Sequence, residues 1–410
     1  MSNVNDIIII GAGQSGGWAA KTLRDSGFTG SVLMIGNESH LPYERPPLSK
    51  QVLLGELAPG ACQLWSQERL LEWGIKVELG NHVELVDRNS GQVVCRDGKS
   101  FHFDQLLLAT GSRPRRLICE GAELEGVHYL RTIEDCLAMR AKLGPASRLV
   151  VVGGGWIGLE VASGLRARGA HATVLEASNQ LCGRSLPPSL SKYFLEQHLR
   201  RGVDVRLGAR LKRFVGNGKI QGVELDDGAI LPATVVLVGI GAVPNDDLAR
   251  SCGLDVGNGI VVDEHCRTAD PRIFACGDVA DQPLGQARVR FESWKNAQDQ
   301  GVAAAKAMLG VEPVTRELPW FWSDQFDINF QLVGIVPPGA QQYRKVNAGD
   351  NGFIDFFVQE GRLVAAAAIN SPRELREAKR AIQKALPFSE DGLLLIQGEG
   401  DAPERQEKER

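Results

Sequence analysis

The chain has 410 residues, of which 43% are hydrophobic and 23% are charged. This balance excludes an intrinsically disordered protein, and the length predicts two to four domains. The formal net charge of −4 and the pI of about 6.0 argue against a nucleic-acid-binding protein, because such proteins usually carry an excess of basic residues.

No apolar stretch reaches the roughly 18 residues that a membrane-spanning helix needs. The longest candidate, residues 231–244, contains Thr234 and two prolines, and we interpret it as a buried strand. The first six residues lack a basic segment, so no secretory signal is expected. The eight cysteines form no CxxC pair, which is typical of buried thiols in a reducing compartment. We therefore expect a cytoplasmic protein without a membrane partner.

In chain order, the first predicted strand is the apolar run at residues 7–10, and the glycine turn GAGQSG follows at 11–16. A helical segment and a second apolar strand at 31–35 come next. In a GxGxxG turn the first glycine permits the bend, the second lets the backbone approach a pyrophosphate, and the third lets helix and strand pack closely. The phosphates bind at the positive N-terminal end of the helix.

The same pattern repeats later, with an apolar run at 149–152, the turn GGGWIG at 153–158 and a strand at 172–175. Glu176 follows this strand, where an acid typically accepts hydrogen bonds from a ribose 2′-OH and repels a 2′-phosphate. NADH is therefore predicted over NADPH, although a solvated loop carboxylate is the alternative for Glu176. In the first copy, Asn37 or Glu38 could reach the adenosine ribose.

Between and beyond these turns we expect short strands at 76–79, 92–95, 106–109, 203–207, 222–225 and 235–240. After about residue 313 the composition changes, because aromatic residues concentrate in PWFWSDQF at 319–326. Strand-like runs and one amphipathic helix at 373–386 follow. The charged tail at 398–410 is expected to fray.

Several further motifs resemble a known group. The segments LLATG at 107–111, LVGIG at 237–241 and IFACGD at 273–278 are similar to the marks of two-dinucleotide-binding flavoproteins related to glutathione reductase. Within that superfamily, LPYERPPLSK at 41–50, FESWKNAQ at 291–298 and PWFWSDQ at 319–325 resemble the ferredoxin reductase components of Rieske-type aromatic-ring dioxygenase systems, which are putidaredoxin reductase-like. The resemblance covers nearly the whole chain.

The resemblance implies an α/β fold with two Rossmann-like domains, which bind FAD and NAD, and a C-terminal α+β domain that packs over the flavin. The FAD-binding domain would be discontinuous, with residues 1–112 as its first part and 240–317 as its second. The NAD-binding domain would span 113–239, and the C-terminal domain 318–410.

Motif matching also implies residue roles. Asp278 should bond the ribityl chain of FAD, Arg131 should meet the flavin pyrophosphate region, and Lys50 should lie beside the isoalloxazine. Glu160 could pair with Lys50 near the nicotinamide, and the family places the segment that contains Trp322 near the flavin. Lys50, Glu160 and Trp322 are therefore the candidate catalytic residues.

Each of these roles has a plain alternative: a helix N-cap for Asp278, surface charges for Lys50 and Glu160, and a core aromatic for Trp322. The place of Asn37 usually carries an acid in relatives. The candidate cofactor-binding residues are Gly11, Gly13, Ser15, Gly16, Asn37, Glu38, Arg45, Lys50, Val83, Ala109, Thr110, Gly111, Arg131, Gly153, Gly155, Ile157, Gly158, Glu176, Arg184, Gly241, Gly277, Asp278 and Trp294.

Disulfide reductases of this superfamily carry a CxxxxC pair soon after the first glycine turn, but this chain has no cysteine between Gly11 and Gly60. Electrons must therefore leave the flavin directly. We predict an NADH:ferredoxin reductase, in which FAD accepts a hydride from NADH and single electrons pass to a 2Fe–2S ferredoxin that supplies a terminal aromatic-ring oxygenase.

Two alternatives stay open at this point. The first is a reductase for a rubredoxin or for a P450-type ferredoxin. The second is a redox-sensing binding protein like apoptosis-inducing factor, which the acidic net charge and the lack of a basic tract disfavour.

Overall fold

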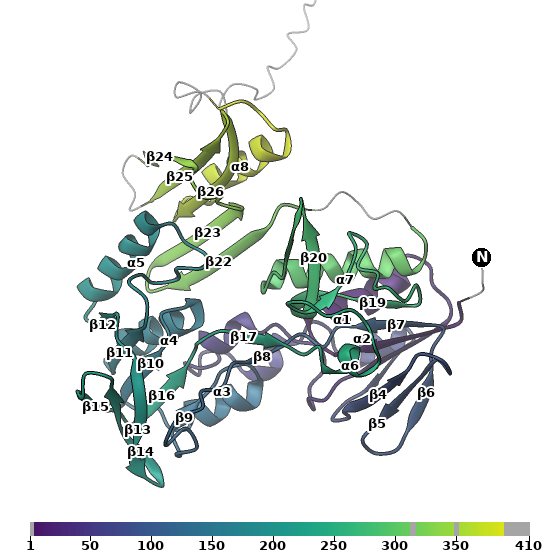
Figure 1. Ribbon diagram of the computed structural model, residues 1–410, viewed down its shortest axis with the longest axis horizontal. Helices are drawn as coiled ribbons and strands as arrows, with labels where there is room; N and C mark the ends of the chain where they lie inside the picture. The colour runs from purple at the N-terminus through teal and green to yellow at the C-terminus, as the bar shows by residue number, and fades with distance from the viewer. Residues whose placement is uncertain (1–3, 312–316, 348–351, 389–410) are drawn as a thin grey trace, which may run out of the picture. The chain divides into compact units, whose positions relative to one another are not determined.

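The apolar runs beside the glycine turns form two parallel sheets in the computed structural model, which describes residues 4–311, 317–347 and 352–388 (Figure 1). The chain divides into two compact units, Met1–Glu317 and Leu318–Arg410. Both sheets belong to the first unit.

The first sheet has the order β19-β7-β1-β2-β3, and all its pairings are parallel. Its strands are β1 (Asp6–Ile10), β2 (Ser31–Ile35), β3 (Ile75–Glu78), β7 (Gln105–Leu108) and β19 (Ile273–Ala275). The strand β19 comes from much later in the chain than the other four, so this half of the unit is discontinuous in sequence.

The second sheet repeats this plan, with the parallel order β12-β11-β10-β16-β9. Its strands are β9 (Val127–His128), β10 (Arg148–Val152), β11 (His171–Glu176), β12 (Asp204–Leu207) and β16 (Val235–Val238). In each sheet the central strand leads through a glycine turn into a helix, α1 (Gln14–Asp25) or α4 (Trp156–Ala167).

The alternation of side chains along β1 explains why four consecutive isoleucines are all buried. Ile7 and Ile9 pack with α1 and α7 (Trp294–Met308), and Ile8 and Ile10 face the opposite core. Figure 1 shows α1 and α7 side by side on one face of this sheet. On the other face lies an antiparallel sheet of β4 (Val83–Asp87), β5 (Gln92–Cys95) and β6 (Ser100–His102).

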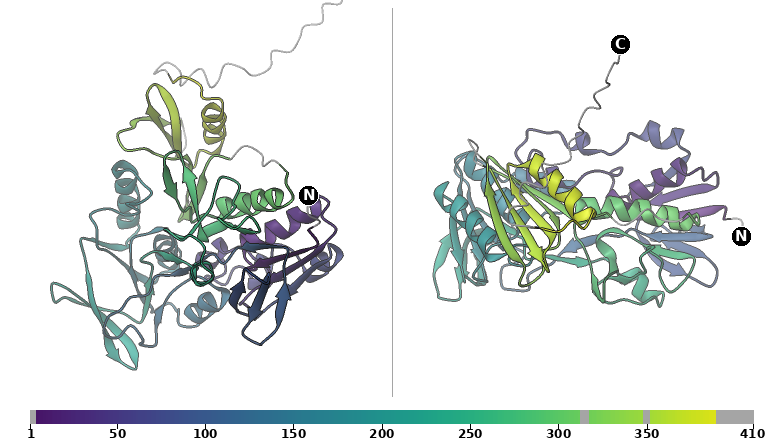
Figure 2. Two further views of the ribbon diagram at one scale, coloured as in Figure 1. Left: turned by 45° about the vertical axis from the view of Figure 1, so that its right-hand side comes forward. Right: turned by 90° about the horizontal axis from the view of Figure 1, so that it is seen from above.

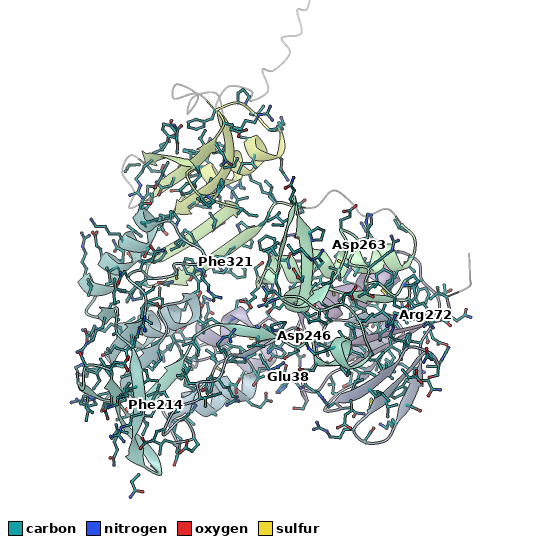
Figure 3. All side chains as sticks on the ribbon, in the orientation of Figure 1. Glu38, Phe214, Asp246, Asp263, Arg272 and Phe321 are labelled. Atoms are coloured by element: carbon teal, nitrogen blue, oxygen red, sulfur yellow. The ribbon has the colours of Figure 1, made fainter. Side chains whose placement is uncertain are left out.

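The second sheet has an equivalent antiparallel insert, made of β13 (Leu211–Asn217), β14 (Lys219–Leu225) and β15 (Ile230–Pro232). Phe214, labelled in Figure 3, is buried there against the apolar side chains of β10 and β16. Each half of the unit therefore combines a parallel sheet with a smaller antiparallel one, and the predicted fold class is confirmed. The predicted domain limits stay predictions.

Two short strands carry the chain between the halves. The strand β8 (Ser112–Pro114) follows the first sheet, and it pairs antiparallel with β17 (Ala242–Pro244), which follows the second. The remaining elements of this unit are α2 (Gln67–Glu72), α3 (Ile133–Arg140), α5 (Pro188–Arg200), α6 (Asp247–Ser251), β18 (Ile260–Val261), β20 (Ala280–Leu284), β21 (Ala287–Val289) and the 3₁₀ turns η1 (Pro46–Ser49), η2 (Pro59–Cys62) and η3 (Gly277–Val279).

One sequence interpretation is wrong. Residues 231–244 do not form one strand but contain the end of β15, all of β16 and β17. The physical reasons are local: Pro232 has no N–H for a sheet ladder, and Gly241 adopts φ +104°, which ends the extended run.

In its described residues, the second unit consists of an antiparallel sheet and a helix that covers it. Its strand order is β22 (Trp320–Gln325), β23 (Ile328–Gly334), β26 (Arg362–Ile369), β25 (Phe353–Gln359) and β24 (Gln341–Val346). Helix α8 (Pro372–Gln383) covers one face (Figure 2). The predicted helix ends earlier than expected, because Ala385 adopts φ +50° and Pro387 follows. The tail at 398–410 lies outside the described residues.

No helix in the described part of the chain is both long and apolar enough to cross a membrane.

Candidate functional site

In the first glycine turn, the packing of the protein requires glycine at positions 11 and 16 but not at position 13. A Cβ on Gly11, which has φ +115°, would lie 2.1 Å from the carbonyl oxygen of Ala109, and a Cβ on Gly16 would lie 2.0 Å from that of Gly11. A Cβ on Gly13 would meet no atom within 4 Å. Gly13 is also the N-cap of α1, and no side chain caps this helix. The space beside Gly13 and the helix N–H groups therefore suit a pyrophosphate.

The second turn has the same division of roles. A Cβ on Gly153 would lie 2.3 Å from the carbonyl oxygen of Gly239, and one on Gly158 would lie 2.7 Å from Val151. At Gly155 the nearest atom would be 3.9 Å away, and this residue is the N-cap of α4, again without a side-chain cap. The open middle glycine in both turns is the observation that fits a dinucleotide at each.

Asp278 lies in η3, directly after β19, and its carboxylate joins two other segments. Oδ2 accepts a hydrogen bond from Ser112 Oγ at 2.9 Å and forms an ion pair with Arg131 Nη2 at 2.9 Å. The Nε–H of Arg131 is buried and has no partner among the described residues. An orphaned guanidinium donor beside the first glycine turn suits an anionic ligand oxygen, which supports the predicted pyrophosphate contact.

Other residues bring η3 and α7 to the start of α1. Gly277 adopts φ +78°, and a Cβ there would lie 2.6 Å from the hydroxyl of Ser15. When the Gln14 amide is oriented with its oxygen toward the indoles, it accepts hydrogen bonds from Trp294 Nε1 at 3.0 Å and from Trp18 Nε1 at 3.2 Å. Ser15, Gly277 and Trp294 therefore gather at the first turn, and their predicted contacts with the cofactor stay predictions.

Glu38 and Arg45 form a cluster with Tyr43. Arg45 Nη2 bonds Glu38 Oε1 at 2.6 Å, and the Tyr43 hydroxyl donates to Glu38 Oε2 at 2.6 Å. Arg45 Nη1 also donates to the carbonyl oxygen of Arg131 at 2.6 Å. Both oxygens of Glu38 are thus engaged within the protein, where the carboxylate holds Arg45, and the predicted ribose contact of Glu38 stays a prediction.

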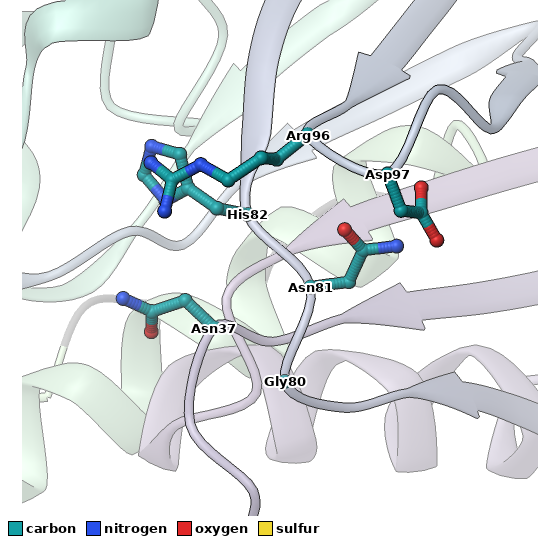
Figure 4. Close-up of a pocket in the computed structure, with 6 residues that line it drawn as sticks. All are labelled: Asn37, Gly80, Asn81, His82, Arg96 and Asp97. Carbon is teal, nitrogen blue, oxygen red and sulfur yellow. The ribbon is translucent and has the colours of Figure 1, made fainter.

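Asn37 lines a surface pocket of about 290 Å³ together with Gly80, Asn81, His82, Arg96 and Asp97 (Figure 4). The loop after β3 closes onto the loop after β2, because Asn81 N donates to Gly36 O at 3.0 Å. Val83, which begins β4 beside this pocket, is buried in the core. Its predicted cofactor contact therefore has to come from backbone atoms or from the edge of its side chain.

Lys50 and Glu160 form the predicted ion pair across the two halves of the unit. Lys50 Nζ lies 2.7 Å from Glu160 Oε2, and the side chains are only 13% and 6% exposed. The Ser49 hydroxyl donates to the same Glu160 oxygen. Glu160 belongs to α4 and Lys50 follows η1, so the alternative of two separate surface charges does not hold.

Glu176 ends β11 and is fixed to the second glycine turn. Its Oε2 accepts from Gly154 N at 2.8 Å, and its Oε1 accepts from Ser178 N at 2.7 Å. The guanidinium of exposed Arg184 lies about 3.4 Å from where a Cβ of Gly241 would be. Ile157, in the first turn of α4, leaves 46% of its surface exposed beside these residues.

Sequence reasoning missed a polar link between the segments that flank the connecting strands β8 and β17. Asn245 Nδ2 donates to the carbonyl oxygen of Thr110 at 2.8 Å, and Thr110 Oγ1 donates to that of Asn245 at 2.7 Å. This link holds the Ala109–Gly111 turn in place, and Ser112 was missed in the same way. Ser112 and Asn245 both lie shortly after similar glycine motifs, LLATG at 107–111 and LVGIG at 237–241. This shared position in the sequence could have indicated that the two segments meet.

Trp322 lies on β22 in the second unit. Its ring stacks on Trp320 with centroids 5.0 Å apart and an interplanar angle of 17°. Its predicted role near the flavin stays a prediction.

The thiol groups are poor nucleophiles. All eight cysteines lie in the described part of the chain, and none is in a disulfide. Burial raises the pKa of Cys136 to about 11 and that of Cys276 to about 12, and it also raises the pKa of Cys62. These groups stay protonated at neutral pH, so they offer no thiolate for disulfide exchange.

Comparison with known proteins agrees with this site. Residues 5–301 match the family model described as pyridine nucleotide-disulphide oxidoreductase, and residues 320–394 match the one described as reductase C-terminal. The chain belongs to the pyridine nucleotide-disulphide oxidoreductase family.

Individual relatives of this family member are ferredoxin reductases. The chain is 39% identical to the ferredoxin–NAD(+) reductase component of the p-cumate 2,3-dioxygenase system of Pseudomonas putida, over 93% of this chain and 94% of the relative. It resembles putidaredoxin reductase in its covalent complex with putidaredoxin, with a TM-score of 0.91, 34% identity and coverage of 96% and 95%. It also resembles the ferredoxin reductase for the CYP199A2 system from Rhodopseudomonas palustris, with a TM-score of 0.89, 31% identity and coverage of 93% and 96%.

Proposed function

We propose that this protein is an FAD-dependent NADH:ferredoxin oxidoreductase that supplies electrons, through a 2Fe–2S ferredoxin, to an oxygenase acting on an aromatic ring. FAD, when bound, would supply the chemistry that links a two-electron hydride donor to a one-electron carrier. The observation that carries the proposal is the buried ion pair between the two halves of the unit, from Glu160 of α4 to Lys50 of the first half.

The residues of this chain would divide the work as follows. Gly13 and the N-terminus of α1 would hold the FAD pyrophosphate, with Arg131 as the cation, and Gly155 would admit that of NADH. Asp278 would orient the ribityl chain from its strand end. Lys50 would supply positive charge beside the flavin, and Glu160 would keep its ammonium group in place.

The proposal is tested by Asp278→Asn, which keeps the shape of the side chain but removes the charge that Arg131 faces. A hydrogen bond to a charged group contributes about 1.5–3 kcal/mol, so the FAD dissociation constant should rise by about tenfold to a hundredfold. FAD release measured by flavin fluorescence reports it. Asp247→Asn, which neutralises an exposed carboxylate of α6, is the control and should retain FAD.

The wild-type protein should be purified with non-covalent FAD and should oxidise NADH only slowly until a 2Fe–2S ferredoxin is added. A correctly folded protein that cannot be reconstituted with FAD would refute the proposal. Comparing ferredoxins of dioxygenase systems with those of P450 systems and with rubredoxins identifies the partner, by the ratio of kcat/KM values.

A further inference from the structure

The segment at residues 46–57, which carries Lys50, is a compact turn held by its own backbone. Lys50 N donates to Pro47 O at 3.1 Å, and Leu54 N donates to Lys50 O at 3.0 Å. Glu56 N donates to Gln51 O at 2.8 Å. Because Leu54 is bonded to the backbone of Lys50, a displacement of Leu54 is carried to the lysine.

This segment contacts one face of α4 at three successive levels. Glu160, Gly164 and the C-cap residue Arg168 are spaced four residues apart, so they follow one side of the helix over a length of about 12 Å. Glu160 pairs with Lys50, Gly164 lies against Leu54, and Arg168 bonds the carbonyl oxygen of Leu54. We call these three contacts the α4 seam.

The two outer contacts of the α4 seam are specific. Arg168 Nη2 lies 2.8 Å from Glu56 Oε1, in addition to the bond from its Nη1 to Leu54 O. A Cβ on Gly164 would lie 3.2 and 3.4 Å from the two methyl carbons of Leu54. Glycine inside a helix costs up to about 1 kcal/mol relative to alanine, so its presence at position 164 has a local use, which is the close approach of Leu54.

The α4 seam connects the second glycine turn, where NADH would bind, to Lys50. The N-terminus of α4 is the second glycine turn, and its Gly155 would cradle the dinucleotide that brings the nicotinamide. Lys50 belongs to the segment at residues 46–57, which contacts α4 through the α4 seam. Helix α3 holds the segment from another direction, because Arg140 Nη1 donates to Val52 O at 3.2 Å. A rigid helix therefore fixes the distance between the NADH site and the lysine.

We propose that Gly164, Arg168 and Leu54 are positioning residues, which set the nicotinamide site relative to Lys50 and the flavin for hydride transfer. This inference rests on the proposed function. The step itself is balanced: a hydride leaves the nicotinamide, which becomes oxidised, and the flavin becomes reduced. Reactive geometry tolerates little error, and a misplacement of about 1 Å can cost a hundredfold in rate.

The test is a graded series at position 164, measured by stopped-flow with the FAD-loaded protein. Gly164→Ala and Gly164→Val should lower the limiting rate of flavin reduction by NADH, by about threefold and about tenfold. The dissociation constant of NADH and the FAD content should not change, because neither glycine turn is touched. The long-wavelength charge-transfer absorbance of the reduced protein with NAD+ should weaken in parallel.

A second substitution separates positioning from simple destabilisation. Leu54→Ala removes the methyl groups that the new side chain meets, so Gly164→Val combined with Leu54→Ala should recover most of the lost rate. Arg168→Gln, which breaks the outer contact without adding bulk, should slow the same step. Ala167→Ser, at an exposed position of the same helix, is the control.

The proposal is overturned if Gly164→Val and Arg168→Gln both reduce the flavin at the wild-type limiting rate. It is also overturned if the double variant stays as slow as Gly164→Val, or if only Tm changes. A wild-type protein that does not oxidise NADH would instead reject the proposed function, so the two failures are distinguishable.

Discussion

Both carboxylate oxygens of Glu176 accept backbone hydrogen bonds, so the side chain is fixed where a cofactor ribose would lie. Each oxygen has a second lone pair for a ribose hydroxyl, but a 2′-phosphate there would meet the negative charge of Glu176. The wild-type protein should therefore prefer NADH. Glu176→Gln should narrow the ratio of kcat/KM values for NADH and NADPH by about tenfold, because it removes a repulsion of about 1–2 kcal/mol.

The control for this variant is Glu196→Gln, which changes an exposed carboxylate of α5. If the wild-type protein already prefers NADPH, the assignment of Glu176 is wrong. Arg184, whose guanidinium lies beside Gly241, would then be the residue to test.

His128 makes folding sensitive to mild acid. Burial lowers the pKa of this imidazole, Lys142 lowers it further and Asp135 opposes the shift, while Nε2 has no partner in the described structure. The unfolded chain takes up this proton near pH 6.5, and the folded chain only at lower pH. The contribution to stability is therefore present above about pH 6.5 and is lost as the pH falls below it.

The measurement is Tm at pH 7.5 and at pH 5.5. The wild-type protein should lose more Tm over this interval than His128→Leu, which has no proton to take up. His102→Gln, at an exposed position, should keep the wild-type slope. Equal slopes for the wild type and His128→Leu would show that another group titrates.

At the scale of elements, the two glycine turns could be predicted from sequence because their geometry is local. A tight bend after a buried strand, with glycine at the positions that contact the backbone, is specified within six residues. The partners of Asp278 could not be predicted, because Ser112 and Arg131 reach it from distant segments. The same holds for Glu38, whose engagement with Arg45 depends on a loop conformation.

The middle glycine of each turn gives a test at this scale. Gly13 and Gly155 have negative φ, and a Cβ on either would meet no protein atom closer than 3.9 Å. Alanine is therefore compatible with the fold, but it would occupy the space that a pyrophosphate needs. Gly13→Ala should weaken FAD binding by at least about tenfold, and Gly155→Ala should raise the dissociation constant of NADH while FAD is retained.

The loss of FAD affinity should occur only in Gly13→Ala, and the loss of NADH affinity with FAD retained should occur only in Gly155→Ala. Measuring both dissociation constants for both variants tests this separation. Gly144→Ala, at an open position in the loop before β10, is the matched control and should affect neither cofactor. Unchanged FAD affinity in Gly13→Ala would mean that the pyrophosphate does not approach this turn.

At the scale of the whole molecule, the repeat of strand, glycine turn, helix and strand predicted two halves with one plan, and both sheets have it. The pairing of Lys50 with Glu160 came from a family resemblance, because residues so far apart in sequence leave no local signal of contact. The strands of the second unit were predicted only as strand-like runs. Their order depends on which strands pair, and the sequence does not state the pairing.

The last prediction concerns where the electrons leave. Because burial keeps thiols such as Cys62 and Cys136 protonated, the protein should show negligible NADH-dependent reduction of glutathione disulfide or lipoamide. It should reduce a cognate 2Fe–2S ferredoxin rapidly.

Trp322→Ala should slow ferredoxin reduction by about tenfold while flavin reduction by NADH, measured separately by stopped-flow, changes by less than about twofold. Trp320→Ala, which removes the ring that stacks on Trp322, is the matched comparison. Equal loss in both half-reactions would make Trp322 a core residue, and vigorous disulfide reduction by the wild-type protein would reject the ferredoxin-reductase assignment.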